Sequence, residues 1–265
     1  MTLARSTIET MKQLLQKGIR IDGRELNEFR RIETTKLGNG QVEIHIGDSK
    51  AIGKCIIEPI EIKDEHGGEL QIVVNFIPMG NKKHNNVRGS KEQIEVSKIV
   101  ERGLKSTKAI DVDGLIIVMG KYAWKVTVVI NVIDDDGNLV DLVSLCCIGC
   151  LLLSKHKEVE IIGSDVVFYQ ESERKAVSLP IANIPVTVSF GICDGIVIVD
   201  PSSKEQEICN SKFTVSINSD GDICGIQQSG TPLSLDVVKK CIHQAKQYAE
   251  KFVLLLKQNF EITNS

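Results

Sequence analysis

Residues 122–156, "YAWKVTVVINVIDDDGNLVDLVSLCCIGCLLLSKH", join a strand pattern to a helix pattern through one acidic turn. Apolar side chains alternate from Trp124 to Val132, which predicts a strand with one buried face. The run that follows the turn is apolar nearly all round, which predicts a helix of about 15 residues buried between two layers. A strand leading into a helix of this kind favours an α+β fold.

The acidic turn holds Asp134, Asp135 and Asp136, followed by Gly137 and Asn138. Carboxylates grouped at the end of a strand could hold a divalent metal or act as acid and base. Asp and Asn beside Gly are also common turn formers. We favour the turn, with Gly137 and Asn138 giving its geometry and an N-terminal cap for the helix.

The rest of the chain repeats the same two patterns. In the first half, Ser6 and Glu9 have capping-box spacing and predict a helix over about 6–17. Four strand-like segments then read as an antiparallel meander, and a second helix is expected over about 91–105. In the second half, six strand-like segments, "VEII", "VVFY", "IPVTVSF", "GIVIVD", "KFTVSIN" and "ICGIQQ", precede a long helix starting near Ser234.

Both halves therefore read as strands followed by a helix. No Pro-rich or Gly/Ser-rich linker separates them. We predict one α+β domain over residues 1–265, built from two similar halves at about 19–155 and 156–265.

The composition limits the function classes. A net charge of -3 excludes a grossly basic nucleic-acid binder but allows a local basic patch. The start of the chain lacks the pattern of a secretory signal, and no apolar run reaches the roughly 18 residues needed to span a bilayer. With eight cysteines read as reduced thiols, we expect an intracellular protein that has no membrane partner.

Cysteines 146, 147 and 150 include a CxxC spacing. A structural zinc site needs a partner pair that this sequence lacks, and a redox motif would sit at an exposed helix start. Buried core thiols are the favoured interpretation. The five histidines are isolated, and no phosphate-loop, dinucleotide or nucleophile-elbow motif is present, so neither a metal nor a cofactor is predicted.

The basic features are a loop over 77–91, which contains Lys82, Lys83 and Arg88, and the pair Arg102 and Lys105 at the end of the second helix. Arg102 and Lys105 share one helix face at i and i+3. Such a cluster could bind phosphates. It could equally be a solvated loop beside a helix end whose dipole favours cations.

The segment "RIDGRELNEFR", Arg20–Arg30, resembles a signature near the start of RNase PH-like proteins. Four more pieces follow in family order: "ERGLKSTKAID", "GKYAWKVTVVINVIDDDGNLVD", "IPVTVSF" and "IVDPSSKEQE". Together they are similar to the ring subunits of the RNA exosome, and among those to the non-catalytic kind. The resemblance implies an RNase PH-like fold of duplicated β-meander and helix units.

The same resemblance implies a lost active site. Phosphorolytic members carry a Gly-Gly-Thr/Ser-Arg-Thr/Ser loop that cradles phosphate, and here Val140 stands in place of its arginine. Those members also keep two carboxylates about six residues apart. Asp200 matches the first and Gln206 the second, so Asp200 is expected to be a degenerate remnant. The alternative is an active phosphorolytic 3′–5′ exoribonuclease that uses Asp200 with a rebuilt phosphate site.

The implied partners are other RNase PH-like subunits in a six-membered ring, RNA-binding cap subunits and RNA, in the nucleus and the cytoplasm. The implied role is structural support of 3′–5′ RNA processing, including rRNA processing, and RNA degradation. Arg102 and Lys105 match cation positions of a family helix motif, and Arg88 matches a loop arginine. Lys82 and Lys83 are added from their charge alone.

Overall fold

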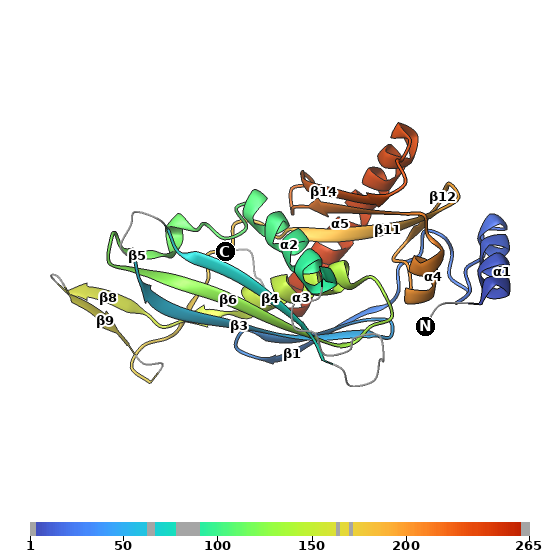
Figure 1. Ribbon diagram of the computed structural model, residues 1–265. Helices are drawn as coiled ribbons and strands as arrows, with labels where there is room; N and C mark the ends of the chain where they lie inside the picture. Colours follow the sequence, from blue (N-terminus) through green and yellow to red (C-terminus); the bar gives the residue numbers. More distant parts are fainter. Residues whose placement is uncertain (1–3, 63–66, 78–90, 163–164, 170–171, 261–265) are drawn as a thin grey trace.

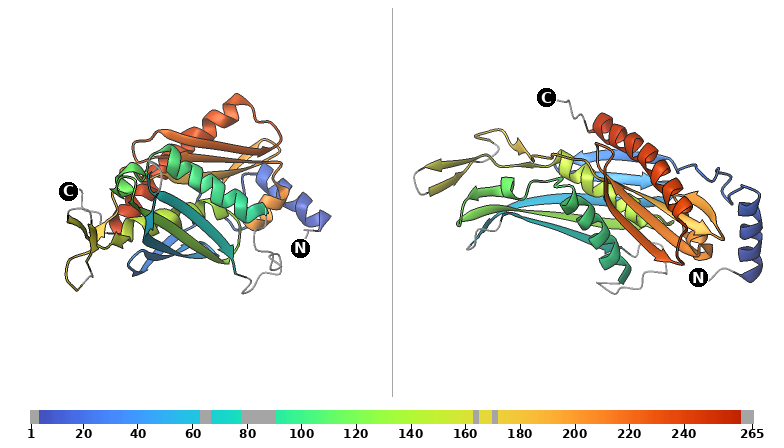
Figure 2. Two further views of the ribbon diagram at one scale, coloured as in Figure 1. Left: turned by 60° about the vertical axis from the view of Figure 1, so that its left-hand side comes forward. Right: turned by 90° about the horizontal axis from the view of Figure 1, so that it is seen from above.

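The computed structural model describes residues 4–62, 67–77, 91–162, 165–169 and 172–260. Two main sheets, one from each half of the chain, are held together by helices that pack between and beside them (Figure 1). The views of Figure 2 show an elongated molecule with helix α1 (Arg5–Gln16) at one end and the hairpin β8 (Val159–Ile162) and β9 (Asp165–Phe168) at the other. The α+β fold class is confirmed.

The first sheet has the order β1-β2-β3-β6-β4. Its strands are β1 (Ile32–Gly38), β2 (Gln41–Ile46), β3 (Ser49–Glu61), β6 (Tyr122–Asp134) and β4 (Glu69–Phe76), with β5 (Ile116–Val118) after a short 3-10 turn (Asp113–Leu115) pairing with β6. The predicted antiparallel meander is right for β1, β2 and β3. It is wrong for β4, because β6 lies between β3 and β4 and pairs parallel with β4.

The second sheet is antiparallel throughout, in the order β12-β11-β13-β14. Its strands are β12 (Ile196–Val199), β11 (Val186–Cys193), β13 (Ser211–Ile217) and β14 (Ile223–Gly230). Two short strands, β7 (Lys155–His156) and β10 (Val177–Ser178), pair separately. Strand β11 is buried along its whole length because helices α3 (Leu139–Leu153) and α5 (Leu235–Asn259) both pack against it.

The remaining helices are α2 (Lys91–Ser106) and α4 (Ser203–Ile208). Helices α2, α3 and α5 confirm the predicted ones, and Ser234 caps α5 by accepting from the Val237 backbone. The predicted capping box of α1 is wrong: Ala4 is the N-cap, and Ser6 lies inside the helix. Helix α4 was not predicted, and it begins with a capping box of Ser202 and Glu205.

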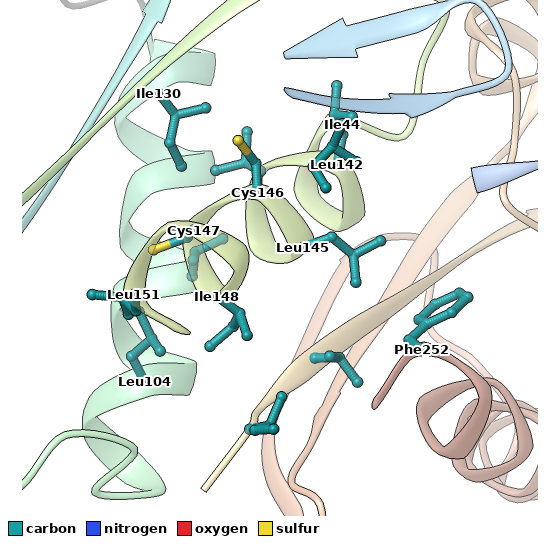
Figure 3. Close-up of a cluster of buried hydrophobic side chains, with 14 of the residues drawn as sticks. Ile44, Leu104, Ile130, Leu142, Leu145, Cys146, Cys147, Ile148, Leu151 and Phe252 are labelled. Carbon is teal, nitrogen blue, oxygen red and sulfur yellow. The ribbon is translucent and has the colours of Figure 1, made fainter. Parts of the chain in front are cut away.

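Helix α3 lies at the centre, between strands β2, β3 and β6 of the first sheet and β11 of the second. Figure 3 shows side chains from Leu142 to Leu151 surrounded by Leu104 of α2, Ile130 of β6 and Phe252 of α5. A Cβ on Gly53 would lie 2.5 Å from the sulfur of Cys150, so glycine is what lets α3 approach β3 closely. Cysteines 146, 147 and 150 are buried, which confirms their core interpretation.

One hydrophobic cluster runs through both halves, from β2 to the end of α5. A smaller cluster joins Met11 and Leu15 of α1 to Cys193, Ile198 and Ile208. The shared core is consistent with a single cooperative unit, and the division into two halves of one domain stays a prediction. Among the described helices, none is both long and apolar enough to cross a membrane.

Candidate functional site

The candidate site begins where β6 ends and α3 starts. Gly137 and Asn138 have φ angles of 86° and 57°, so the predicted turn geometry is confirmed. The Asp136 carbonyl accepts from the Ser203 backbone at 2.9 Å. A Cβ on Gly137 would lie 2.5 Å from the Ser203 nitrogen, so only glycine lets this loop pass the start of α4.

Asn138 occupies the N-cap position of α3, but its side chain makes no capping hydrogen bond. Its amide nitrogen instead donates to Asp141 at 2.9 Å and to Asp200 at 2.6 Å. The predicted cap is therefore right in position and wrong in mechanism. The side chain links the start of α3 to the end of β12.

The Asp200 carboxylate is completely buried and lies at the centre of an ion-pair network. It accepts hydrogen bonds from the Arg24 side chain at 2.9 Å, from the Arg30 backbone at 2.9 Å, and from two nitrogens of the Arg30 guanidinium at 2.8 Å each. Burial raises the pKa of Asp200, but the hydrogen bonds and charge of Arg30 outweigh it, so the pKa lies below its ordinary value. Asp200 is held as a carboxylate.

Arg20 makes a second buried pair in the same network. Its guanidinium donates to both carboxylate oxygens of Glu205, at 2.8 and 2.5 Å, and to the carbonyl oxygens of Val199 and Asp200 at 2.8 and 2.9 Å. Glu205 also accepts from the Ser202 backbone at 2.9 Å as part of the α4 capping box. We use the name arginine clamp for the network of Arg20, Arg24, Arg30, Asp200 and Glu205.

The arginine clamp gives the "RIDGRELNEFR" segment a structural explanation. The side chains of Arg20, Arg24 and Arg30 are 0%, 10% and 8% exposed. Their charges are matched by carboxylates of the second half, and so they are not available to RNA phosphates. The segment fastens the start of the first sheet to the end of β12 and to α4.

Asp141 is a further buried carboxyl group, in the first turn of α3. It accepts from the backbone and the hydroxyl of Ser189, at 2.9 and 2.7 Å, and from Asn138. Burial, together with the nearby charge of Asp200, raises its pKa to about 7 against the lowering effect of these hydrogen bonds. Among the described residues, no Lys, Arg or His forms an ion pair with it.

A cavity of about 100 Å³ opens at the start of α3, between α2 and the second sheet. Its floor includes Leu139 and Val140 of α3, and the described residues that line it are Glu92, Glu95, Val96, Ile99, Asn138, Leu139, Val140, Ser189, Phe190, Pro201, Gln206, Lys212, Thr214, Gln227 and Ser229. Val140, which the family resemblance aligns with a phosphate-binding arginine, therefore lines this cavity. We name this space the α3 cavity.

The charges around the α3 cavity do not suit an anion. Two acids, Glu92 and Glu95, and one cation, Lys212, are found among the described residues that line it. The Lys212 ammonium donates to Gln206 at 3.2 Å, and Gln206 donates to the Pro201 carbonyl at 3.2 Å. A phosphate here would lack the arginine fork that gives bidentate, charge-assisted recognition.

The predicted site residues are not brought together. Asp200 lies in the arginine clamp and is not among the described residues lining the α3 cavity, whereas Gln206 lines it. Of the predicted pair with six-residue spacing, Asp200 and Gln206, only Asp200 carries a carboxylate. The assignment of Asp200 as a degenerate catalytic remnant stays a prediction.

Of the predicted RNA-binding residues, the structure describes Arg102 and Lys105, both on α2. Arg102 is exposed and lines a small hollow with Thr214, Ser216 and Gln227. Lys105 is exposed too, but its ammonium pairs with Glu101 at 2.5 Å. Lys82, Lys83 and Arg88 lie outside the described residues. Within the described ranges, no group of three or more His, Cys, Asp or Glu side chains could hold a metal ion.

Comparison with known proteins places the chain in a family. The model of the 3′ exoribonuclease family, domain 1, matches residues 28–157, and that of domain 2 of the same family matches residues 183–248. The first match contains Arg30 and the whole turn before α3, and the second contains Asp200, Glu205 and the strands of the second sheet.

Similar curated proteins are exosome components. The chain is 30% identical over 261 residues to exosome complex component Rrp42 of Sulfurisphaera tokodaii, covering 96% of this chain and 94% of that protein. It is 27% identical to exosome complex component RRP45 of Saccharomyces cerevisiae, covering 95% and 90%. It is 28% identical to RRP45B of Arabidopsis thaliana, but spans only 59% of the length of that protein.

The pieces "VDP" and "GIQQSG" also resemble the eukaryotic smaller polymyositis/scleroderma autoantigen, and the RRP45 relatives agree with that type of subunit.

Solved structures support the fold. A chain of the Archaeoglobus fulgidus exosome with RNA bound to the active site superposes with a TM-score of 0.83 at 24% identity, covering 95% of this chain and 98% of that one. A chain of an archaeal exosome core gives 0.78, also at 24% identity, covering 97% and 96%. The chain thus belongs to the 3′ exoribonuclease (RNase PH) family, with exosome ring subunits as its relatives.

Proposed function

We propose that this chain is a non-catalytic subunit of an exosome ring, which supports 3′–5′ RNA processing and degradation without phosphorolysis of its own. The observation that carries the proposal is Val140 at the floor of the α3 cavity, where an arginine would hold the attacking phosphate. The cavity rim adds Glu92 and Glu95, which repel an anion. Asp200, which the family resemblance aligns with a catalytic carboxylate, is saturated by the arginine clamp.

Phosphorolysis needs a phosphate oxygen to attack the terminal phosphodiester, releasing a nucleoside diphosphate and a shortened RNA. The attacking phosphate must be held close to the phosphodiester, although both are anions, which requires cations and aimed donors between them. In the α3 cavity, the described residues offer one lysine for that task, and its ammonium already bonds Gln206. This balance of charge favours the structural role over the alternative of an active phosphorolytic exoribonuclease.

The ring partners in this proposal are other RNase PH-like subunits and RNA-binding cap subunits, inside the cell in the nucleus and the cytoplasm. RNA would contact Arg102, whose exposed guanidinium stands beside the groove between α2 and β14. Lys105, Arg88, Lys82 and Lys83 belong to the same proposed RNA-binding set. Their joint role depends on charge and on the family resemblance.

Soaking crystals of the chain in inorganic phosphate tests the loss of the active site. We expect no ordered anion within hydrogen-bond distance of residues 137–141. A phosphate bound by the backbone nitrogens of this loop, seen again in the ring with its partners, would favour the phosphorolytic alternative.

A further inference from the structure

Asp141, Ser189 and Thr214 form a hydrogen-bonded chain that leads from the buried start of α3 to residues of the α3 cavity. The Ser189 hydroxyl is hydrogen-bonded to Asp141 Oδ1 at 2.7 Å, and it lies 3.0 Å from the Thr214 hydroxyl, where either oxygen can be the donor. Ser189 and Thr214 are each 8% exposed and line the cavity, whereas Asp141 is completely buried. The chain therefore joins a titratable group in the core to two hydroxyl groups beside a cavity.

The two carboxyl oxygens of Asp141 have different neighbours. Oδ2 accepts from the Ser189 backbone nitrogen and from the Asn138 amide nitrogen, both at 2.9 Å. These two nitrogens donate and cannot accept a hydrogen bond. Oδ1 faces the Ser189 hydroxyl, which can do either. A proton on Asp141 must therefore lie on Oδ1 and be donated to Ser189 Oγ.

In the described part of the chain, no cation balances a negative charge on Asp141. The arginines of the clamp already pair with Asp200 and Glu205, and the buried positions of β2 and β3, which pack on α3, are uncharged. Charged groups on the other elements around the start of α3 are Asp136 after β6, Asp200 after β12, Glu205 of α4, Glu92 and Glu95 of α2, and Lys212 of β13. Burial and the charge of Asp200 raise the pKa of Asp141 to about 7, so both of its protonation states occur near neutral pH.

The two protonation states orient the hydroxyl groups in opposite directions. When Asp141 is neutral, Oδ1 donates to Ser189, the Ser189 hydrogen turns to Thr214, and the Thr214 hydrogen is free for another acceptor. When Asp141 is ionised, the Ser189 hydrogen turns back to Oδ1, and Thr214 can donate to Ser189. Ionisation releases only the Oδ1 proton, to water, while each hydroxyl rotates and keeps its own hydrogen.

We propose that Asp141, Ser189 and Thr214 form a pH-sensitive relay, in which the protonation of a buried carboxyl group decides whether the Thr214 hydroxyl beside the α3 cavity is available as a donor or as an acceptor. At acid pH this hydroxyl is a free donor, and at alkaline pH its hydrogen is used within the relay. The reversal needs no movement of the backbone. The relay lies beyond the proposed function, because it requires neither RNA nor a ring.

NMR titration of the full chain between about pH 5 and about pH 9 tests the relay. The carbon-13 signals of the Asp141 carboxyl group, assigned with Asp141→Asn, and of the β-carbon of residue 214 are followed together. We expect both to change with one midpoint at about pH 7. Ser189→Ala should abolish the transition at residue 214. It should also raise the midpoint of Asp141 by about one pH unit, because the ionised carboxylate loses a charge-assisted hydrogen bond.

Three further variants separate the relay from simpler effects. Thr214→Ser keeps the hydroxyl and should keep the shared midpoint. Thr214→Val removes the far end of the relay and should raise the midpoint of Asp141, by less than Ser189→Ala does. Ser216→Ala removes a different buried hydroxyl of β13 and should leave both transitions unchanged.

Three results would overturn the relay. The first is an Asp141 carboxyl group that stays ionised over the whole range. The second is a transition at residue 214 that persists with the same amplitude in Ser189→Ala, since the field of the Asp141 charge alone would then explain it. The third is an unchanged Asp141 midpoint in Thr214→Val, which decides the matter even where Ser189→Ala does not fold. Each of them leaves the proposed function standing, because that function concerns phosphate.

Discussion

Breaking the arginine clamp at Arg30 should destabilise the fold without any direct loss of an RNA contact. The substitution Arg30→Met keeps most of the side-chain length and removes the charge. Asp200 then loses two hydrogen bonds of 2.8 Å, and the Asp136 and Gly137 carbonyls lose theirs at 2.9 and 3.2 Å. Removing one partner of a buried ion pair costs about 3–5 kcal/mol. Arg24 and Asn138 still hold Asp200, so we expect the lower end, about 3 kcal/mol.

The neighbouring Arg31 provides a matched control. It pairs with Glu33 at 3.1 Å, and its side chain is 85% exposed, so Arg31→Met should change the free energy of unfolding by less than about 1 kcal/mol. Chemical denaturation followed by circular dichroism measures both variants. Adding Asp200→Asn to Arg30→Met should recover part of the loss, because the unpaired buried carboxylate is then gone. Equal effects of Arg30→Met and Arg31→Met would refute the clamp.

Three further predictions concern neighbouring features. Because the pKa of Asp141 is raised to about 7, the free energy of unfolding of the wild-type chain should fall by on the order of 4 kcal/mol as the pH rises from 4 through 7. The free energy of unfolding of Asp141→Asn should change far less, and parallel pH profiles of the two proteins would argue against a protonated Asp141. Gly137→Ala should cost about 1 kcal/mol or more beyond Gly23→Ala in denaturation, since both have φ near 85° but only Gly137 is crowded. Arg102→Glu with Lys105→Glu should lower RNA crosslinking to the assembled ring and flatten its salt dependence; an unchanged salt slope would return both residues to an ordinary solvated surface.

The helices were predictable because their signals are local. An apolar run without a polar stripe can only be a buried helix or strand, and 15 residues favour a helix, so α3 was correctly predicted. The position of β4 was not predictable. Its alternation is the same whether its neighbour is parallel or antiparallel, and its partner β6 lies some fifty residues further along the chain.

The candidate site likewise has one part that was predictable from the sequence and one part that was not. The turn at Gly137 and Asn138 follows from residue types that tolerate positive φ. The arginine clamp does not follow from local residue types, because Arg24 and Arg30 contact Asp200 across 176 and 170 positions of sequence. Two local signals were available and missed: the Ser202 to Glu205 spacing of a capping box, and Asp141 as an acid inside an apolar helix.

The central claim is that the chain lacks phosphorolytic activity because its α3 cavity cannot hold phosphate. The most direct test is a ring reconstituted with partners whose own active sites are disabled, incubated with 3′-end-labelled RNA with and without inorganic phosphate. We predict no phosphate-dependent release of nucleoside diphosphates, while the same ring with intact partners releases them. Phosphate-dependent release from the disabled ring, abolished by a substitution at residues 138–140, would contradict the account.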